Sequence, residues 1–263
     1  VKPVVDIVRQ HPNRRISIQY HGLSTIRRLT ISHADTIANH GGISTLLNAL
    51  TSPKAATGGT LSLSLHEEEK IEGMIHERAL ACLTGLLSPS SNADGLDLVA
   101  SIHTEEGLSA IFRMIRKYQS KREILEAAFE SLFYLSFRVR VVLGSIVGTS
   151  TAIKHGVGAQ AARSLEKQFC LEENVFVLLG TLNQYVEESE SICQRGLGIL
   201  VNIHAFMTQK QQELQRDVLA LDGGVRLVLG VMRRHGLAVA IQEYGVGLLA
   251  SILKLSSTNL TTN

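Results

Sequence analysis

One helical pattern occurs five times along this chain, and it limits the possible folds more than any other feature. Each copy is centred on a small residue, which we call the anchor: Gly22, Ala79, Ala128, Gly196 and Gly245. Apolar residues stand one, four and seven positions after every anchor, so they form a stripe along one face of a helix. A small residue within the stripe lets a neighbouring helix approach closely. We therefore predict a protein built from repeated helices, and we call the five copies stripe helices.

The segments between the stripe helices also recur. Gly41-Gly42, Glu106-Gly107 and Gly223-Gly224 each precede a helical segment of medium length. Glycine at such a junction indicates a helix C-terminal cap followed by a sharp turn. The repeating unit is then a short helix, a turn with Gly, a medium helix and the stripe helix. Because residues 4–8 resemble a medium helix whose unit lacks its beginning, we expect the sequence to be part of a longer protein.

Two intervals between anchors are longer than the others. Gly22 to Ala79 is 57 residues and Ala128 to Gly196 is 68, against 49 for the remaining two intervals. The excess lies at 53–73, which includes the charged run Glu67 to Lys70, and at 144–158, which is rich in Gly, Ser and Thr. This composition predicts exposed loops inserted between helices, and a further helix is expected at 159–168. Insertions at such places leave a stacked core intact.

The three-helix unit resembles the armadillo repeat. The residues that carry the resemblance are the Gly turn with the apolar helix after it, at 41–50, and the pattern with Gln, a small residue, Leu and Ile, at 242–252. HEAT repeats, with two helices and a Pro-containing turn, are the near alternative, but the Gly turns and the short first helix favour armadillo. The resemblance implies an all-α, right-handed superhelical solenoid of about five three-helix repeats, the first incomplete. It covers residues 1–263 as one domain, with the stripe helices lining a concave groove.

The composition excludes several classes of protein. With 44% hydrophobic and 19% charged residues, the chain can bury a large core and does not resemble a disordered protein. Its formal charge of +2 argues against binding to nucleic acid or to a membrane surface. Cys82, Cys170 and Cys193 fall at no metal or disulfide spacing and are expected to be buried thiols. No apolar run is long enough to span a bilayer and no signal peptide is present, so we expect a cytoplasmic protein.

Motifs for catalysis are absent or explained by packing. The sequence from Gly245 to Ala250 fits a loosened dinucleotide-binding fingerprint, but that motif needs a preceding strand, and here it lies within a helical pattern. The chain contains no Gly-Lys dipeptide, no G-x-S-x-G and no H-E-x-x-H. Its ten His residues have no metal-ligand spacing and are expected at the surface or at helix caps. We expect no enzyme activity, no cofactor and no metal.

The resemblance also directs attention to the groove. Peptide-carrying armadillo proteins present Trp two residues after the anchor and Asn six residues after it. Here no anchor has Trp at that offset, and Asn202 alone matches the Asn offset, so recognition of a nuclear-import signal is not expected. The inferred groove is instead mildly basic and aromatic, which suits an acidic or phosphorylated protein segment bound by Arg. The predicted partner-binding residues are Arg28, Arg78, Tyr134, Arg195, Asn202 and Tyr244.

Other functions fit the same pattern. The chain could be the regulatory solenoid of a larger enzyme, or a structural subunit of a cytoskeletal or ciliary assembly. A second basic surface comprises Arg113, Arg116, Lys117, Lys121 and Arg122, with Arg233 and Arg234 at the matching place later in the chain. Positive charge near the end of a helix is favoured by the helix dipole, so this surface has a structural explanation. Because fold does not fix function, a protein–protein interaction scaffold remains the principal expectation.

Overall fold

The computed structural model describes residues 1–11, 16–51, 64–91, 95–146, 156–206 and 223–258. All regular structure in these ranges is helical, with twelve α-helices and no strand. The chain divides into two compact units, Val1–Leu135 and Ser136–Asn263, which are described separately. Across the same ranges, no helix has the length and apolar character needed to cross a bilayer.

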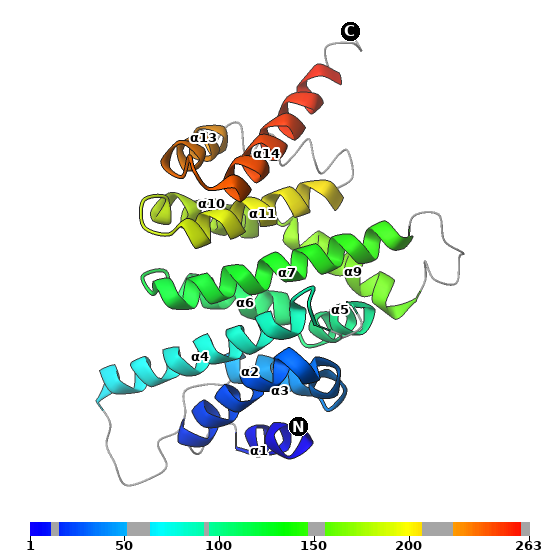
Figure 1. Cartoon of the computed structure of the whole chain (residues 1–263), viewed down its shortest axis with the longest axis vertical. Coiled ribbons are helices and arrows are strands. Elements are labelled where there is room, and N and C mark those ends of the chain that lie inside the picture. The colour runs from blue at the N-terminus through cyan, green and yellow to red at the C-terminus, as the bar shows by residue number, and fades with distance from the viewer. Residues whose placement is uncertain (12–15, 52–63, 92–94, 147–155, 207–222, 259–263) are drawn as a thin grey trace. The chain divides into compact units, whose positions relative to one another are not determined.

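Unit 1 contains six helices and the first part of a seventh. They are α1 (Lys2–Gln10), α2 (Ile16–Asn39), α3 (Gly42–Thr51), α4 (Leu65–Leu87), α5 (Gly95–Thr104), α6 (Gly107–Lys117) and α7 (Arg122–Ile146), which continues into unit 2. The stripe helices α2 and α4 lie side by side (Figure 1). A kink at His33, where φ is −134° and ψ is 30°, separates the stripe part of α2 from the short helix predicted after it.

Unit 2 contains the remainder of α7 and five further helices. They are α9 (Val157–Phe169), α10 (Glu172–Tyr185), α11 (Glu190–Phe206), α13 (Gly224–Arg234) and α14 (Val239–Thr258). The helix expected at 159–168 is confirmed as α9. Of the loop predicted at 144–158, the first residues belong to α7 and the last to α9, and 147–155 lie outside the described residues.

The prediction of a loop at 53–73 is wrong for the second half of that range. Helix α4 begins at Leu65, so Glu67 and its charged neighbours are helical. Ser64 and Glu67 form a capping box in which each side chain accepts a hydrogen bond from the other residue's backbone N–H. The part of the predicted loop at 52–63 lies outside the described residues.

Tight turns precede the medium helices at the predicted places. Gly41 and Gly223 have φ angles of +75° and +76°, which glycine adopts without steric cost. At the third junction the same left-handed conformation falls on Glu106, with φ of 53°. The glycine that follows it, Gly107, is instead buried at the start of α6.

The anchors pack as the pattern predicts. A Cβ atom added at Gly22, Gly196 or Gly245 would come closer than 3.0 Å to a side chain of the helix immediately before it. The contacted residues are Val8 on α1, Leu182 on α10 and Met232 on α13, respectively. The small anchor is therefore needed for close packing of a stripe helix on its own medium helix.

Successive stripe helices in unit 1 are linked by a recurring hydrogen bond. Cys82, three residues after its anchor, donates to the carbonyl oxygen of Leu23, one residue after the previous anchor, at 3.1 Å. Ser131, also three residues after its anchor, donates to the carbonyl oxygen of Leu80 at 3.1 Å. The two bonds have the same offsets, so the two pairs of neighbouring stripe helices are packed in the same register.

Burial follows the stripe except at Leu29 and Leu249, which are partly buried, and at Val246, which is exposed. The residue one position after the anchor is fully buried in four copies and 58% exposed in the fifth, at Val246 of α14. Cys82 and Cys193 are buried as predicted, whereas Cys170 is only partly buried. The expectation that His residues lie at the surface or at caps is wrong for His76 and His204, which are 2% and 7% exposed.

Candidate functional site

A basic pocket lies on the stripe helices of unit 1. It has a volume of about 480 Å³ and is formed mainly by α2, with one residue from α4. We call it the arginine pocket. Its lining consists of Tyr20, His21, Ser24, Arg27, Arg28, Ile31 and Arg78.

The helical spacing of α2 brings these side chains to one face. Tyr20, Ser24, Arg27 and Ile31 are separated by three or four residues, which is about one helical turn at each step. The packing of α4 beside α2 adds Arg78 to the same face. The pocket thus depends on the register in which the two stripe helices pack.

Arg78 is held in place by Tyr20. Its Nη2 donates a hydrogen bond to the Tyr20 hydroxyl at 3.3 Å, and its guanidinium carbon lies 5.3 Å from the centre of the Tyr20 ring. The Nε atom of Arg78 is buried and has no hydrogen-bond partner among the described residues. A partly buried charge with an unsatisfied donor is stabilised when an anion approaches it.

The pocket carries three guanidinium groups and no acidic lining residue. Among the described residues, no carboxylate forms an ion pair with Arg27, Arg28 or Arg78. Arginine stays protonated at all physiological pH values. The pocket is therefore a local concentration of positive charge in a chain whose net charge is only +2.

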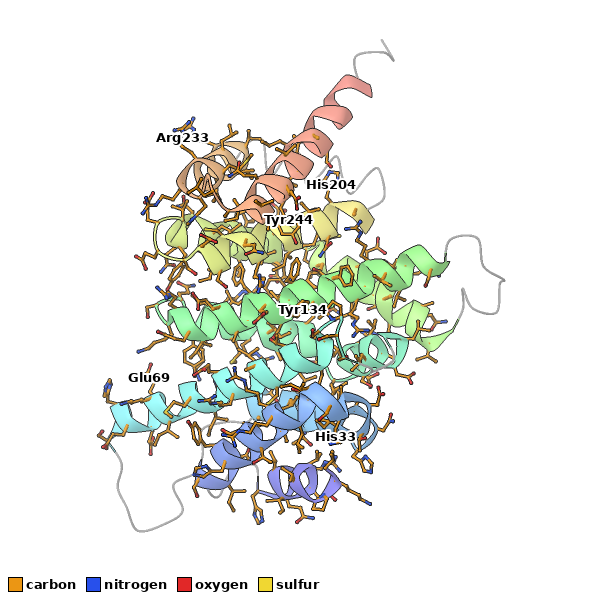
Figure 2. The ribbon with its side chains drawn as sticks, viewed as in Figure 1. His33, Glu69, Tyr134, His204, Arg233 and Tyr244 are labelled. Carbon is orange, nitrogen blue, oxygen red and sulfur yellow. The ribbon has the colours of Figure 1, made fainter. Side chains whose placement is uncertain are left out.

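The predicted partner-binding residues of unit 1 are only partly brought together. Arg28 and Arg78 both line the arginine pocket. Tyr134 lies on α7 (Figure 2) and is not among the lining residues; its ring centre is 5.5 Å from that of Phe133, its neighbour in the chain.

Asn202 in unit 2 does not have the exposed position that a peptide clamp requires. It is 4% exposed, and its amide is used within the unit. The amide nitrogen donates to the Ser136 hydroxyl at 3.1 Å, and the amide oxygen accepts from Nη1 of Arg140 at 3.2 Å. Asn202 thus links α11 to α7, and a bound peptide would have to displace these partners.

Arg195 and Tyr244 occupy the same offset, one residue before the anchor, on α11 and α14. Both are partly buried, and Figure 2 shows Tyr244 on α14. These two helices pack against each other within unit 2. Neither residue lines the arginine pocket.

The second basic surface is partly neutralised by neighbours. Lys117 forms an ion pair with Glu72 at 2.7 Å, and Arg122 forms one with Glu126 at 3.2 Å. The guanidinium of Arg116 lies 5.8 Å from the ring centre of Phe112. Two of the charges of this surface are therefore paired with carboxylates, whereas no carboxylate of the described residues pairs with the arginines of the pocket.

Of the seven lining residues of the pocket, the predicted partner-binding residues include only Arg28 and Arg78. Tyr20 and Ile31 are among those that they miss. Tyr20 stands two residues before its anchor, where three of the four other copies have Glu and the fourth has Gln. Ile31 is 87% exposed, but other large apolar side chains are exposed too, such as Leu237 at 100% and Val157 at 75%, so its exposure alone does not indicate a site. The replacement of an acidic residue by Tyr at a repeat offset was a signal that could have identified Tyr20.

A buried titratable cluster links α4 to α6 and the residue after it. Nδ1 of His76 lies 2.8 Å from the Tyr118 hydroxyl, and the amine of Lys117 lies 5.1 Å from the centre of the Tyr118 ring. Burial lowers the pKa of His76 to about 4, because the effect of burial is larger than that of Glu72, whose charge acts to raise this pKa. Burial likewise raises the pKa of Tyr118. With both groups neutral, this pair joins two helices and does not form a charged site.

The described residues thus define an all-helical protein with recurring helix-packing contacts and one strongly basic pocket. No protein-family model matches the chain, and no curated protein is similar enough in sequence to count as a match. The membership in the armadillo family stays a prediction from the residues alone.

Proposed function

We propose that this chain is a non-catalytic protein-interaction scaffold that binds an acidic or phosphorylated segment of a partner protein. The observation that carries the proposal is the arginine pocket, where Arg27, Arg28 and Arg78 gather without a carboxylate to neutralise them. Arginine forks bind carboxylate and phosphate oxygens in pairs, and arginine is enriched among residues that dominate interface energies.

We further propose that the helices form an armadillo-like solenoid and that the protein acts in the cytoplasm. The packing of the anchors on the medium helices supports the solenoid, as do the two bonds that Cys82 and Ser131 make to the preceding stripe helix. In such a fold each unit is stabilised by its neighbours, and extended surfaces are available to partners.

The pocket suits a segment of protein better than a small enclosed ligand. It is an open depression along α2, and exposed Ile31 stands at its edge. From Tyr20 to Ile31 the helix rises about 16 Å, at about 1.5 Å per residue. About five residues of an extended peptide, at about 3.3 Å each, span that length.

Binding of acidic peptides to the whole chain tests the proposal. The probe is a fluorescent peptide library with one acidic or phosphorylated residue at the centre and mixed neighbours, followed by fluorescence anisotropy. We expect binding by the unchanged protein and at least about a tenfold loss in the double variant Arg28→Glu/Arg78→Glu, since it reverses two of the three charges.

A matched variant controls for net charge. Arg113→Glu/Lys121→Glu makes the same change in charge at two exposed residues of unit 1 outside the pocket. We expect this variant to bind like the unchanged protein. Equal losses in both double variants, or no binding of any acidic peptide, would contradict the assignment of this pocket.

A further inference from the structure

We infer that the arginine pocket selects a phosphorylated side chain over a carboxylate, and that Ile31 favours an apolar residue beside it. The inference rests on the proposed function and specifies the ligand of the same site. Selection of phosphate over carboxylate would make the interaction depend on phosphorylation of the partner. Three features of the pocket support it: the number of its donors, the fixing of Arg78, and the exposure of Ile31.

The pocket has more positive charge than a carboxylate can use. A single arginine fork already pairs with both oxygens of a carboxylate. A phosphate monoester presents three strong acceptor oxygens and a charge between −1.5 and −2 at neutral pH. Arg27, Arg28 and Arg78 together provide one guanidinium group for each of these three oxygens.

The three guanidinium groups repel one another in the empty pocket. Arg27 and Arg28 are consecutive on α2, and the charge of Arg78 is brought to them by α4. No carboxylate of the described residues relieves this repulsion. A dianion relieves about twice as much of it as a monoanion, because the interaction energy is proportional to the charge of the ligand.

Tyr20 prepares Arg78 for the ligand. The hydrogen bond at 3.3 Å and the ring contact at 5.3 Å fix the guanidinium before anything binds. Less conformational entropy is then lost when the anion arrives. Tyr20 uses one donor of this guanidinium, and the Nε of Arg78 lacks a hydrogen-bond partner among the described residues.

Ile31 supplies an apolar contact next to the charges. It stands three residues after Arg28 and four after Arg27, so the three side chains share one face of α2. At 87% exposure, its side chain is almost entirely in contact with solvent. An apolar side chain adjacent to the phosphorylated residue would remove part of this surface from water, which is favourable.

Three peptides that differ only at one position test the phosphate preference. They carry phosphoserine, glutamate or serine between identical apolar neighbours, and their dissociation constants are measured with the full chain by fluorescence anisotropy. We expect the phosphoserine peptide to bind at least about tenfold more tightly than the glutamate peptide, and the serine peptide to bind weakest. Inorganic phosphate should compete only at concentrations far above that of the peptide.

Two substitutions separate the contributions. Arg28→Lys keeps the charge but loses the planar fork. It should therefore weaken binding of the phosphoserine peptide more than binding of the glutamate peptide. Ile31→Ser should remove the advantage of apolar over polar neighbours in the peptide. Ile7→Ser, at a residue of α1 that is 48% exposed and outside the pocket, is the matched control and should leave that advantage unchanged.

The outcomes distinguish the two proposals. Equal affinity for the phosphoserine and glutamate peptides would overturn this inference and leave the proposed function standing. Failure of both peptides to bind would overturn the proposed function as well. Tighter binding of a short RNA or DNA oligonucleotide than of the phosphoserine peptide would also overturn this inference, because the pocket would then recognise a nucleic-acid backbone.

Discussion

The side chain of His76 couples the stability of unit 1 to pH. Its pKa is lowered by burial from 6.5 to about 4, so the folded protein keeps it neutral where the unfolded chain binds a proton. The neutral form of His76 contributes fully to the stability of unit 1 above pH 6.5. As pH falls from about 6.5 to about 4, the unfolded state is progressively favoured, by up to roughly 3 kcal/mol.

We therefore predict that His76→Gln reduces the pH dependence of unfolding. Glutamine retains a group that can form a hydrogen bond with Tyr118, but it does not titrate. In urea unfolding at pH 7, 6, 5 and 4, the free energy of unfolding should fall less for His76→Gln than for the unchanged protein. His66→Gln, on the exposed start of the same helix, should follow the unchanged protein. Parallel curves for His76→Gln and the unchanged protein would contradict the prediction.

Cysteine reactivity is a second property of single residues. Burial raises the pKa of Cys82, Cys170 and Cys193 to about 12. Because the thiolate is the reactive form, all three should react slowly with an aromatic disulfide reagent at pH 8 and rapidly after denaturation. Absorbance of the released thiolate measures both rates. Fast reaction of any of the three in the folded protein would contradict this expectation.

At the scale of the helices, two glycines of unit 2 should respond to alanine in opposite directions. A Cβ at Gly196 would lie 2.5 Å from Cδ2 and 2.9 Å from Cγ of Leu182, so the buried leucine must move. Gly196→Ala should cost about 1–3 kcal/mol of unfolding free energy. A Cβ at Gly180 meets nothing within 4 Å, and Gly180→Ala should stabilise α10 by about 0.5–1 kcal/mol.

Urea unfolding of the two alanine variants measures both effects. Each replaces a helical glycine by alanine, so the change in helix propensity is common to both, and the difference between them reports packing at the anchor. If Gly196→Ala were as stable as Gly180→Ala, the close approach of α11 and α10 would be refuted.

A glutamine side chain makes the same contact between the medium helix and the stripe helix in the first and in the last copy of the repeat. Gln19 donates to the carbonyl oxygens of Val8 and His11 at 2.8 and 2.7 Å, and Gln242 donates to those of Met232 and His235 at 2.9 and 3.2 Å. Both glutamines stand three residues before their anchors. They donate to carbonyl groups at the C-terminal end of the medium helix, where intrahelical donors are missing. The carbonyl oxygen of His235 also accepts a hydrogen bond from the backbone N–H of Ala238, at 3.0 Å.

Gln242→Leu should therefore destabilise unit 2 by about 1–3 kcal/mol, because the carbonyl group of Met232 loses its side-chain donor in a partly buried place. Gln10→Leu, at an exposed residue of α1, should change the free energy of unfolding by less than about 0.5 kcal/mol. Thermal unfolding followed by circular dichroism compares the two variants. A similar melting temperature for Gln242→Leu and the unchanged protein would show that the cap contributes little.

The helices were largely predictable from sequence because their stripes repeat in register with the anchors. The start of α4 was not, since Glu67 and its neighbours are charged and show no apolar periodicity; only the Ser64–Glu67 capping box indicated a helix there. The burial of Asn202 was unpredictable for a different reason. Its partner Ser136 is 66 residues away, and a motif contains no information about such a contact. The pocket was predictable only in part: Arg28 and Arg78 were found by their offsets from the anchors, whereas Tyr20 and Ile31 were not.

For the molecule as a whole, the net charge of +2 is small beside the local charge of the arginine pocket. Its interaction with a phosphopeptide should therefore depend on salt only modestly, with affinity falling about threefold to tenfold between 50 and 200 mM salt. A protein that contacts six to ten phosphates of a nucleic acid loses about 10³-fold to 10⁵-fold in affinity over the same range of salt concentration. Anisotropy titrations at the two salt concentrations measure the ratio. A loss above about a hundredfold would indicate a much larger basic surface than this pocket.

The glutamine cap bears on how such a chain can grow by gene duplication. Gln242 and the carbonyl groups that it satisfies lie within ten residues of one another, and Gln19 and its partners within eleven. A duplicated unit therefore carries both halves of the contact in one segment of DNA. A new copy of such a unit needs no compensating mutation elsewhere to complete its own helix junction.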